Sequence, residues 1–228
     1  MRCFLILLFS LSAAFALENF TVVLDGAPSP VGVWAPKDTK ASQVVVWFHG
    51  GMTSSRCDKG LEAGEGFSKF APGAVVASPS ACGERNWASE FGVKVTDAAL
   101  DSLEKRLGKK ISEVALVGVS DGALGVVSYS LYGRRSVKTR LLISSFLEPF
   151  GSPKRLASEP KLKDGSWTFL QGASDRLYPS ERTFPWLSEF CKTDGIRCTL
   201  HFDNAGEHDW SYWAEKRAAW LQDFAGSL

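Results

Sequence analysis

The sequence predicts one α/β domain with a mostly parallel central sheet of about eight strands and helices on both faces of that sheet. Short runs of β-forming residues alternate with helical patterns, and the central runs are continuously apolar, as in strands covered on both faces. The 228 residues are 45% hydrophobic, which excludes a disordered or collagen-like chain. No repeat or low-complexity linker interrupts residues 17–228, and an α/β sheet can extend past about 200 residues as one domain.

The expected strands and helices follow from two hydrophobic periods. Strands are expected at Phe20–Leu24, Val31–Ala35, Gln43–Phe48, Ala74–Ser78, Glu113–Val119, Leu141–Phe146, Trp167–Gln171 and Arg197–Phe202. Helices are expected from the stripe Val93, Thr96, Leu100, Leu103 and Leu107 before Gly108, the run Ala123–Tyr132, the stripe Phe184, Leu187 and Cys191 before Gly195, and a last helix through Trp213, Trp220, Leu221 and Phe224. Such alternation makes right-handed crossovers, so the sheet is mostly parallel, with the first two strands as an antiparallel edge.

The first sixteen residues are expected to be a signal peptide and not part of the fold. Arg2 is a minimal basic region, Cys3–Leu11 is apolar but too short to span a bilayer, and Ala14–Ala16 has the small-x-small pattern of a cleavage site. The alternative is an uncleaved anchor helix. Cleavage before Leu17 predicts a secreted or periplasmic protein, residues 17–228, without a stable membrane anchor.

The charge balance gives no reason to expect nucleic acid or an anionic membrane surface as a partner. The chain has 26 basic and 25 acidic residues, and loss of Arg2 with the signal peptide would leave 25 of each. Only short basic clusters occur, and we interpret the one formed by Arg134, Arg135, Lys138 and Arg140 as a solvated face.

Four cysteines remain after residue 16, and an exported chain with an even number of cysteines is expected to pair them. Of the three possible connectivities we favour Cys191–Cys198, across a helix-to-strand turn, which leaves Cys57–Cys82. A metal site is the alternative, but the sequence has neither a C-x-x-C spacing nor clustered histidines. We therefore expect two disulfides, no metal and no other cofactor.

The segment Gly118–Gly122 (Gly-Val-Ser-Asp-Gly) is the strongest functional motif, because it directly follows an apolar strand and precedes a helix. A serine on such a tight turn needs glycines two residues before and after it, since a Cβ there would collide with neighbouring backbone. The turn lifts the Ser120 hydroxyl above the sheet, and the following helix directs its N-terminal amides to the same place. The plainer alternative is a strand-to-helix connection in which Ser120 only caps the helix.

A serine hydroxyl needs a neighbouring base to take its proton, and the chain has three histidines. His201 lies inside an expected strand, where a satisfied or surface histidine is the simpler interpretation, and His49 begins a glycine loop with a different role. Elimination favours His208, in the loop before the last helix, as the base. The alternative is that His208 only caps that helix, although Asp209 is the better N-cap residue.

The imidazole in turn needs a carboxylate that fixes its tautomer. Asp175 is the first candidate, because it follows an expected strand and a glycine-containing turn. Asp203 also ends a strand, but it shares a loop with His208 and is expected to point away from it. The order Ser120, Asp175, His208 is that of α/β hydrolases and not that of chymotrypsin-like or subtilisin-like enzymes.

Backbone amides that stabilise a developing oxyanion are expected from the loop His49-Gly50-Gly51-Met52, at the end of an apolar strand. Glycine in this loop lets the main chain approach a substrate closely. The expected donors are the amides of Gly51, Met52 and Asp121, the last of which directly follows the serine.

With these residues, the whole of residues 17–228 resembles the α/β-hydrolase superfamily. The compact size, the leader, the HGG loop and the ending Glu207–Trp213 are similar to small secreted esterases of the esterase D, feruloyl esterase and polyhydroxyalkanoate depolymerase kind. The resemblance implies that the catalytic histidine precedes an acidic, Trp-containing helix start, as His208 does. Met52 stands where the lipase loop has a third glycine, and Asp121 is acidic where those families more often have a neutral residue. A carboxylate there would raise the pKa of a neighbouring imidazole or repel anionic substrates.

The substrate pocket is expected to be open. Two strands and a helix take most of the segment between Ser120 and Asp175, which leaves no room for a large cap domain. Asn86, Trp87 and Tyr178 are the polar and aromatic residues expected beside the substrate. For Trp87, packing in the core is an equally good interpretation, since the chain has eight Trp residues.

These residues predict a secreted serine hydrolase that cleaves a small-molecule or polymer-linked carboxylic ester through an acyl-enzyme. A peptidase or amidase with the same three side chains is the enzymatic alternative, because the motifs do not distinguish an ester from an amide. A non-catalytic binding module on a hydrolase scaffold is the other alternative, since a fold does not guarantee its chemistry.

Overall fold

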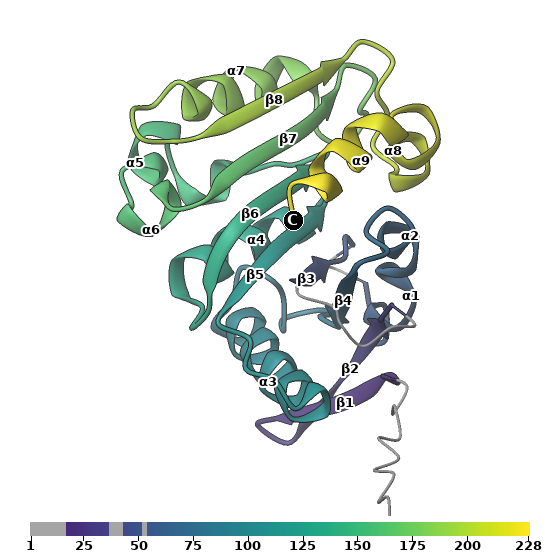
Figure 1. The fold of residues 1–228 in the computed structure, drawn as a ribbon. Helices are drawn as coiled ribbons and strands as arrows, with labels where there is room; N and C mark the ends of the chain where they lie inside the picture. Colours follow the sequence, from purple (N-terminus) through teal and green to yellow (C-terminus); the bar gives the residue numbers. More distant parts are fainter. Residues whose placement is uncertain (1–16, 37–42, 52–53) are drawn as a thin grey trace, which may run out of the picture.

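The computed structural model describes residues 17–36, 43–51 and 54–228. In that part of the chain the strands form one sheet in the order β1-β2-β4-β3-β5-β6-β7-β8 (Figure 1). The strands are β1 (Phe20–Leu24), β2 (Ala27–Trp34), β3 (Gln43–Phe48), β4 (Ala74–Pro79), β5 (Glu113–Val119), β6 (Ser136–Ile143), β7 (Ser166–Gly172) and β8 (Cys198–Asp203). β1 pairs with β2 and β2 with β4 in antiparallel register, whereas all other pairs are parallel. The predicted mostly parallel sheet with an antiparallel edge is therefore confirmed.

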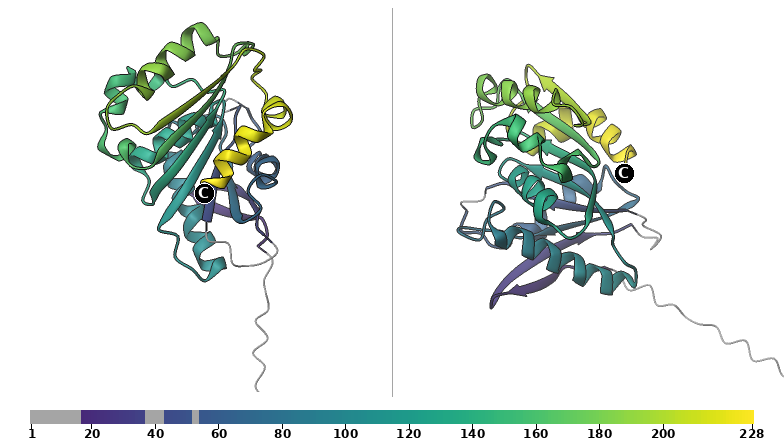
Figure 2. Two further views of the ribbon diagram at one scale, coloured as in Figure 1. Left: turned by 45° about the horizontal axis from the view of Figure 1, so that its top comes forward. Right: turned by 90° about the vertical axis from the view of Figure 1, so that its left-hand side faces the viewer.

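Helices cover both faces of this sheet (Figures 1 and 2). One face carries α3 (Glu90–Leu107), α4 (Gly122–Tyr132), α5 (Pro153–Ala157), α6 (Pro160–Lys163) and α7 (Ser180–Cys191). The other face carries α1 (Gly60–Ala63), α2 (Glu65–Ser68), α8 (Trp210–Lys216) and α9 (Ala218–Gly226). Alternate residues of β3 divide between the two cores, since Val44 and Val46 pack on the first side and Val45 and Trp47 on the second. The continuous apolar run of β3 is thus explained by burial on both faces.

Two strands begin earlier than the sequence predicts. β2 starts at Ala27 and not at Val31, because Pro28 and Pro30 obscure the strand pattern; both pair with the edge strand β1. β6 runs over Ser136–Ile143 and not over Leu141–Phe146, because its first half is polar in sequence.

The basic cluster at the start of β6 is a solvated face only in part, which corrects our interpretation: the Arg134 side chain is 59% exposed, whereas Arg140 is buried. Arg140 is buried, pairs in register with Trp167 of β7, and holds its guanidinium 4.5 Å from the centre of that ring. It donates to Ser130 Oγ at 2.7 Å and to the backbone carbonyls of Asp164 and Lys161. Burial lowers the pKa of Arg140 to about 10. These acceptors and the ring offset the cost of burying the cation, so a polar run forms an inner strand.

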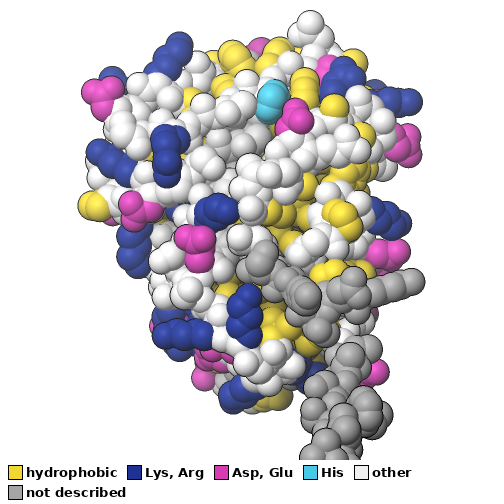
Figure 3. Space-filling model, viewed as in Figure 1, with side chains coloured by type: hydrophobic (Ala, Val, Ile, Leu, Met, Phe, Trp, Pro, Cys, Tyr) yellow, Lys and Arg dark blue, Asp and Glu magenta, His cyan; other side chains and the backbone are white. Residues whose placement is uncertain are grey.

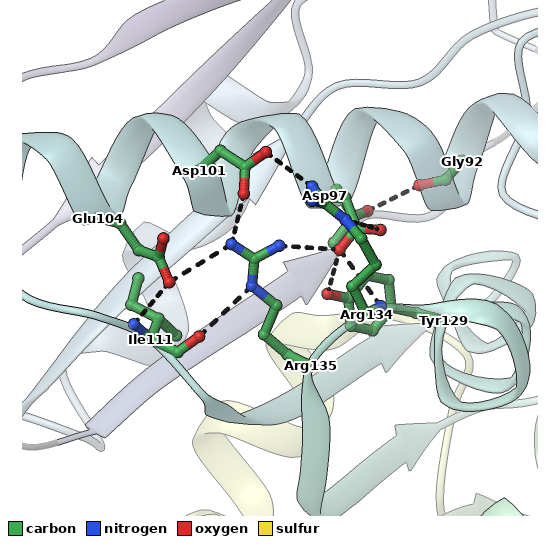
Figure 4. A network of polar contacts seen from close by, with 9 residues as sticks. Gly92, Asp97, Asp101, Glu104, Ile111, Tyr129, Arg134 and Arg135 are labelled. Atoms are coloured by element: carbon green, nitrogen blue, oxygen red, sulfur yellow. Dashed lines mark hydrogen bonds and ion pairs between the residues drawn. The ribbon is translucent and has the colours of Figure 1, made fainter.

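The side chain of Arg135, in the same cluster, is only 8% exposed and joins a network between α3 and the α4–β6 connection (Figure 4). Its guanidinium contacts the carboxylates of Asp97, Asp101 and Glu104. Tyr129 of α4 donates its hydroxyl to Asp97 at 2.8 Å, and burial together with that carboxylate raises the pKa of Tyr129. The network therefore fastens α3 to α4 and to the start of β6.

The predicted last helix is two helices, α8 and α9, separated at Arg217, which has φ −130° and ψ 31°. The guanidinium of Arg217 contacts Asp203 at 2.6 Å, at the end of β8. Trp213 and Leu221 nevertheless both pack in the same core, as their hydrophobic pattern predicts. The break coincides with the contact between Arg217 and Asp203, which hydrophobic periodicity does not report.

Both favoured disulfides are present. Cys57 is bonded to Cys82, with the Cα atoms 5.0 Å apart, and Cys191 to Cys198, with the Cα atoms 5.2 Å apart. The second bond links the end of α7 to the start of β8, and the first links the segment before α1 to the residues after β4.

Charges of both signs are mixed on the face of the molecule that Figure 3 shows. On the face shown in Figure 3, Lys and Arg side chains alternate with Asp and Glu side chains, without a broad field of one sign. Within the described ranges, no helix is both long enough and apolar enough to cross a bilayer. The expected signal peptide, residues 1–16, lies outside the described residues.

Candidate active site

Ser120 lies on a sharp turn between β5 and α4, with a φ of 55° that side-chain-bearing residues rarely adopt. A Cβ on Gly118 would stand 2.5 Å from the carbonyl oxygen of Gly122, and one on Gly122 would stand 2.0 Å from that of Phe48. Both glycines are therefore required by close backbone approach, as the motif predicts. The turn is the strained strand-to-helix connection known as a nucleophile elbow.

This packing predicts a large effect for Gly122→Ala. The added methyl group would force β3 and α4 apart, and we expect the free energy of unfolding to fall by about 3 kcal/mol or more. Gly73→Ala is the matched control, because a Cβ at Gly73 meets no atom within 4 Å. Urea denaturation of the two variants measures the difference; equal midpoints would show that the backbone around Ser120 is not as close as described.

Three side chains that follow the carboxyl ends of β5, β7 and β8 form one chain of hydrogen bonds. Ser120 Oγ, after β5, lies 2.8 Å from Nε2 of His208, which follows β8. Nδ1 of His208 lies 2.9 Å and 3.0 Å from the two carboxylate oxygens of Asp175, which follows β7. When the neutral imidazole carries its proton on Nδ1, Nε2 can accept the proton of Ser120. The structure thus brings together the three residues expected from the sequence.

The Asp175 carboxylate is fixed by its own loop. Its side chain is fully buried, and its Oδ1 accepts the backbone N–H groups of Leu177 at 2.9 Å and Tyr178 at 2.8 Å. Two amide donors on one oxygen hold the carboxylate in the orientation that faces His208. The acid is therefore positioned before any substrate binds.

Asp203, the second candidate acid, is engaged elsewhere. Its oxygens accept hydrogen bonds from Arg217 at 2.8 Å, from the Tyr212 hydroxyl at 2.8 Å and from the Ala205 amide at 3.1 Å. Burial opposes ionisation of Asp203, but these donors outweigh it and lower its pKa. The expectation that Asp203 points away from His208 agrees with these contacts.

The glycine loop after β3 lies against Ser120. A Cβ on Gly50 would stand 3.0 Å from the Cβ of Ser120, and Gly51 has a φ of 70°, which favours glycine. Asp121 occupies the N-cap position of α4, so its amide belongs to the positive end of that helix. The loop and the helix start thus flank the serine, as an oxyanion site requires. Met52, the third expected donor, lies outside the described residues.

His49 orients this loop, a role that the sequence analysis left unassigned. Its Nδ1 lies 2.9 Å from the Gly50 carbonyl oxygen, and its Nε2 accepts the amide of Ala81 at 3.1 Å. Burial lowers the pKa of His49 to about 4, so the ring is neutral at pH 7 and Nδ1 carries the donated proton. Because a trans peptide places C=O and N–H on opposite sides, fixing the Gly50 carbonyl also fixes the direction of the Gly51 amide.

Trp87 lies in the core and not beside a substrate, which corrects one of its two interpretations. Its side chain is fully buried, packs edge-on against Phe48 with the rings 5.1 Å apart, and donates Nε1–H to the His49 carbonyl at 2.8 Å. It therefore supports the glycine loop from beneath. Tryptophan is common both in hydrophobic cores and in binding pockets, so the sequence alone did not show which of the two holds Trp87.

Tyr178, the other residue expected near the substrate, borders the hydrogen-bonded chain. Its hydroxyl donates to Asp121 Oδ1 at 2.7 Å, and its ring stands edge-on to His208 with the ring centres 5.1 Å apart. Burial and the bond to Asp121 raise the pKa of Tyr178 to about 12, so it remains a donor at neutral pH. Tyr178 thus joins the loop of the acid to the residue that follows the serine.

The connection from β6 to β7 is short. It forms only a 3-10 turn (Glu148–Phe150) and the helices α5 and α6, so this part of the chain holds no cap domain. Leu177, beside Tyr178, is 66% exposed at the rim. Among the described residues, no group of three or more His, Cys, Asp or Glu side chains is arranged to hold a metal ion.

Comparison with solved structures identifies the fold. The chain is similar to a ferulic acid esterase, at 16% sequence identity over 92% of this chain and 97% of that one, with a TM-score of 0.70. It is similar to an Agrobacterium tumefaciens protein assigned provisionally to the α/β hydrolases, at 13% identity over 91% and 94% of the chains, with a TM-score of 0.70. It is also similar to Thermogutta terrifontis esterase 2 phosphonylated by cyclosarin, at 15% identity over 91% of each chain, with a TM-score of 0.65.

The chain therefore has the α/β-hydrolase fold, as its residues predict. No model of a protein family matches the sequence, and no curated protein matches it either. At these identities the structural likeness establishes the fold, and the activity has to be argued from the site itself.

Proposed function

We propose that this chain is a secreted serine hydrolase that cleaves carboxylic esters through an acyl-enzyme. The observation that carries the proposal is the unbroken hydrogen-bonded chain from Ser120 through His208 to Asp175, placed on a nucleophile elbow. A hydroxyl, an imidazole and a buried carboxylate in this order are the components of nucleophilic acyl transfer.

In the proposed reaction Ser120 Oγ attacks the ester carbonyl while Nε2 of His208 takes the hydroxyl proton. Asp175 keeps the remaining proton on Nδ1 and stabilises the imidazolium that forms. The tetrahedral oxyanion is held by the amides of Gly51 and Asp121, with that of Met52 as a further candidate. Collapse of the intermediate transfers the proton from His208 to the departing alcohol and leaves an acylated serine. Water, activated by the same imidazole, then releases the acid and restores the enzyme.

The solved structures similar to this chain support an ester substrate, because two of those compared are named as esterases. The open rim and the absence of a cap between β6 and β7 suit a substrate joined to a larger alcohol or polymer. A binding module without chemistry is disfavoured, because such a module has no use for a serine held in a strained conformation within bonding reach of an imidazole.

We further propose that residues 17–228 form the mature domain after removal of residues 1–16, and that it is secreted or periplasmic. Two disulfides are compatible with an oxidising compartment, where such bonds persist. Mass spectrometry of protein exported by an expression host tests this proposal; an N-terminus other than Leu17 would contradict the cleavage site.

The ester proposal is tested by matched substrates. We expect kcat/KM for p-nitrophenyl acetate to exceed that for p-nitroacetanilide by at least about tenfold, since an alkoxide-type leaving group needs less help from the general acid than an amine does. We also expect a fluorophosphonate probe to label the protein once. A higher kcat/KM for the anilide would favour the amidase alternative, and absence of both labelling and hydrolysis would favour a binding module.

A further inference from the structure

Lys59 lies at the start of α1, and its side chain reaches the glycine loop His49–Gly51. There the ammonium group donates a hydrogen bond to the Gly51 carbonyl oxygen at 3.2 Å. The contact is close, because a Cβ added to Gly51 would stand 2.4 Å from Nζ of Lys59. The ammonium group therefore occupies the space that a side chain at position 51 would fill. No motif of the sequence analysis includes Lys59, and neither the motif residues nor His49 explain its position.

The base of the Lys59 side chain is anchored. The next residue, Gly60, donates its amide to Ser80 Oγ at 2.9 Å, and a Cβ on Gly60 would stand 2.3 Å from the Ser78 carbonyl oxygen. Cys57, two residues before Lys59, is bonded to Cys82. The backbone under Lys59 is thus held against the end of β4, so the ammonium group is presented from a fixed point.

Gly51 needs such an anchor, since a glycine at φ 70° has other conformations of similar energy. His49 holds the Gly50 carbonyl, before the Gly51 amide, and Lys59 holds the Gly51 carbonyl after it. Donors that stabilise a transition state are effective when their directions are set in advance. Two side-chain donors thus hold the loop on both sides of the Gly51 amide.

The charge of Lys59 also acts on this loop. Within the described residues, no carboxylate lies within salt-bridge distance of Lys59, and the Gly51 carbonyl is the acceptor that its ammonium group contacts. Burial lowers the pKa of His49 and the hydrogen bond to the Gly50 carbonyl opposes this, while the charge of Lys59 lowers the pKa and that of Asp121 raises it. A half-buried cation without a carboxylate partner contributes a positive potential where negative charge would develop.

We propose that Lys59 is a positioning residue of the oxyanion loop, which fixes the Gly51 carbonyl and supplies positive potential to the tetrahedral intermediate. This inference rests on the proposed ester hydrolysis. Because acylation and deacylation both pass through such an intermediate, Lys59 serves both steps equally.

The test uses three substitutions in the full chain with its disulfides intact. Lys59→Met removes both the donor and the charge, Lys59→Gln keeps a donor without charge, and Lys59→Arg keeps both. Lys69→Met is the matched control, because Lys69 is 72% exposed and pairs only at the surface with Glu65. Stopped-flow hydrolysis of p-nitrophenyl acetate gives both rate constants, and titration with a fluorophosphonate gives the concentration of active sites.

Loss of one direct oxyanion donor costs about 10²–10³ in kcat, so for the indirect action of Lys59 we expect Lys59→Met to slow acylation and deacylation by about 10- to 100-fold. KM should stay within about twofold, Lys59→Arg should retain most activity, and Lys59→Gln should lie between the two. Rates per titrated site within about twofold of the unsubstituted enzyme in Lys59→Met would overturn the inference, as would a raised KM with unchanged kcat or an equal loss in Lys59→Arg.

These outcomes are distinct from failure of the proposed function. If the unsubstituted chain neither hydrolyses the ester nor reacts with the fluorophosphonate, the ester-hydrolase proposal falls, and the role of Lys59 falls with it. If the unsubstituted chain is active and Lys59→Met matches it, only the inference about Lys59 is wrong. A lower melting temperature with normal rates per active site would assign Lys59 a structural role alone and would likewise overturn the inference.

Discussion

Ser120→Ala is expected to lower kcat for p-nitrophenyl acetate by about 10⁵-fold or more, the loss typical when the nucleophile of such a triad is removed. The Oγ that lies 2.8 Å from Nε2 of His208 is the atom that forms the acyl bond, and no acyl-enzyme can form without it. The small activity that remains would come from water attacking an ester held in the oxyanion site. Labelling by a fluorophosphonate should disappear together with turnover.

The fold should survive this change. The elbow depends on Gly118 and Gly122, whose close contacts involve backbone atoms that Ser120→Ala leaves in place. Ser158→Ala is the control, because its exposed hydroxyl bonds only locally to the Arg155 carbonyl at 2.6 Å, and full activity is expected. Retention of more than about 1% of kcat by Ser120→Ala, per correctly folded molecule, would place the nucleophile at another residue.

The positions of Ser120 and Asp175 could be predicted because each follows a strand whose pattern is legible. β5 and β7 are continuously buried near their ends, so Ser120 and Asp175 fall at the carboxyl edge of a parallel sheet, where functional groups collect. His208 was reached by elimination among three histidines. Because the strands are parallel, their carboxyl ends lie at one edge of the sheet, and the three residues that follow them meet there.

The supporting contacts could not be predicted, because they depend on where side chains point. The stacking of Arg140 on Trp167 turns a polar run into a buried strand, and hydropathy records only the polarity. The bonds from Lys59 to Gly51 and from Trp87 to His49 join loops that no periodicity relates. Hydrophobic patterns report the burial of a face, whereas hydrogen bonds between loops require coordinates.

Asp175→Asn is expected to lower kcat by about 10⁴-fold with little change in the fold, the effect seen when the acid of such a triad becomes an amide. The carboxylate accepts the Nδ1 proton of His208, whereas an amide can present its own NH2 group to that nitrogen. The imidazole would then carry its proton on Nε2, where it can no longer accept one from Ser120. Initial rates with p-nitrophenyl acetate, normalised to native protein by near-UV circular dichroism, measure the loss.

Asp203→Asn makes the same chemical change at the other aspartate that ends a strand, and it should produce the opposite result. The charge of Asp203 is bound by Arg217 and Tyr212, so its loss should lower the urea midpoint while kcat per active site stays unchanged. Burial raises the pKa of Asp203, but those donors lower it by more, so the pKa is lower in the folded chain than in the unfolded chain. The ionised carboxylate therefore stabilises the fold above the pKa of the unfolded chain, and this stabilisation is lost as the pH falls through the pKa of the folded chain. The midpoints of the Asp203→Asn variant and the unsubstituted chain should therefore converge in acid.

If Asp203→Asn lost turnover and Asp175→Asn kept it, the acid partner of His208 would be Asp203, and the loop after β8 would have to be rearranged in the working enzyme.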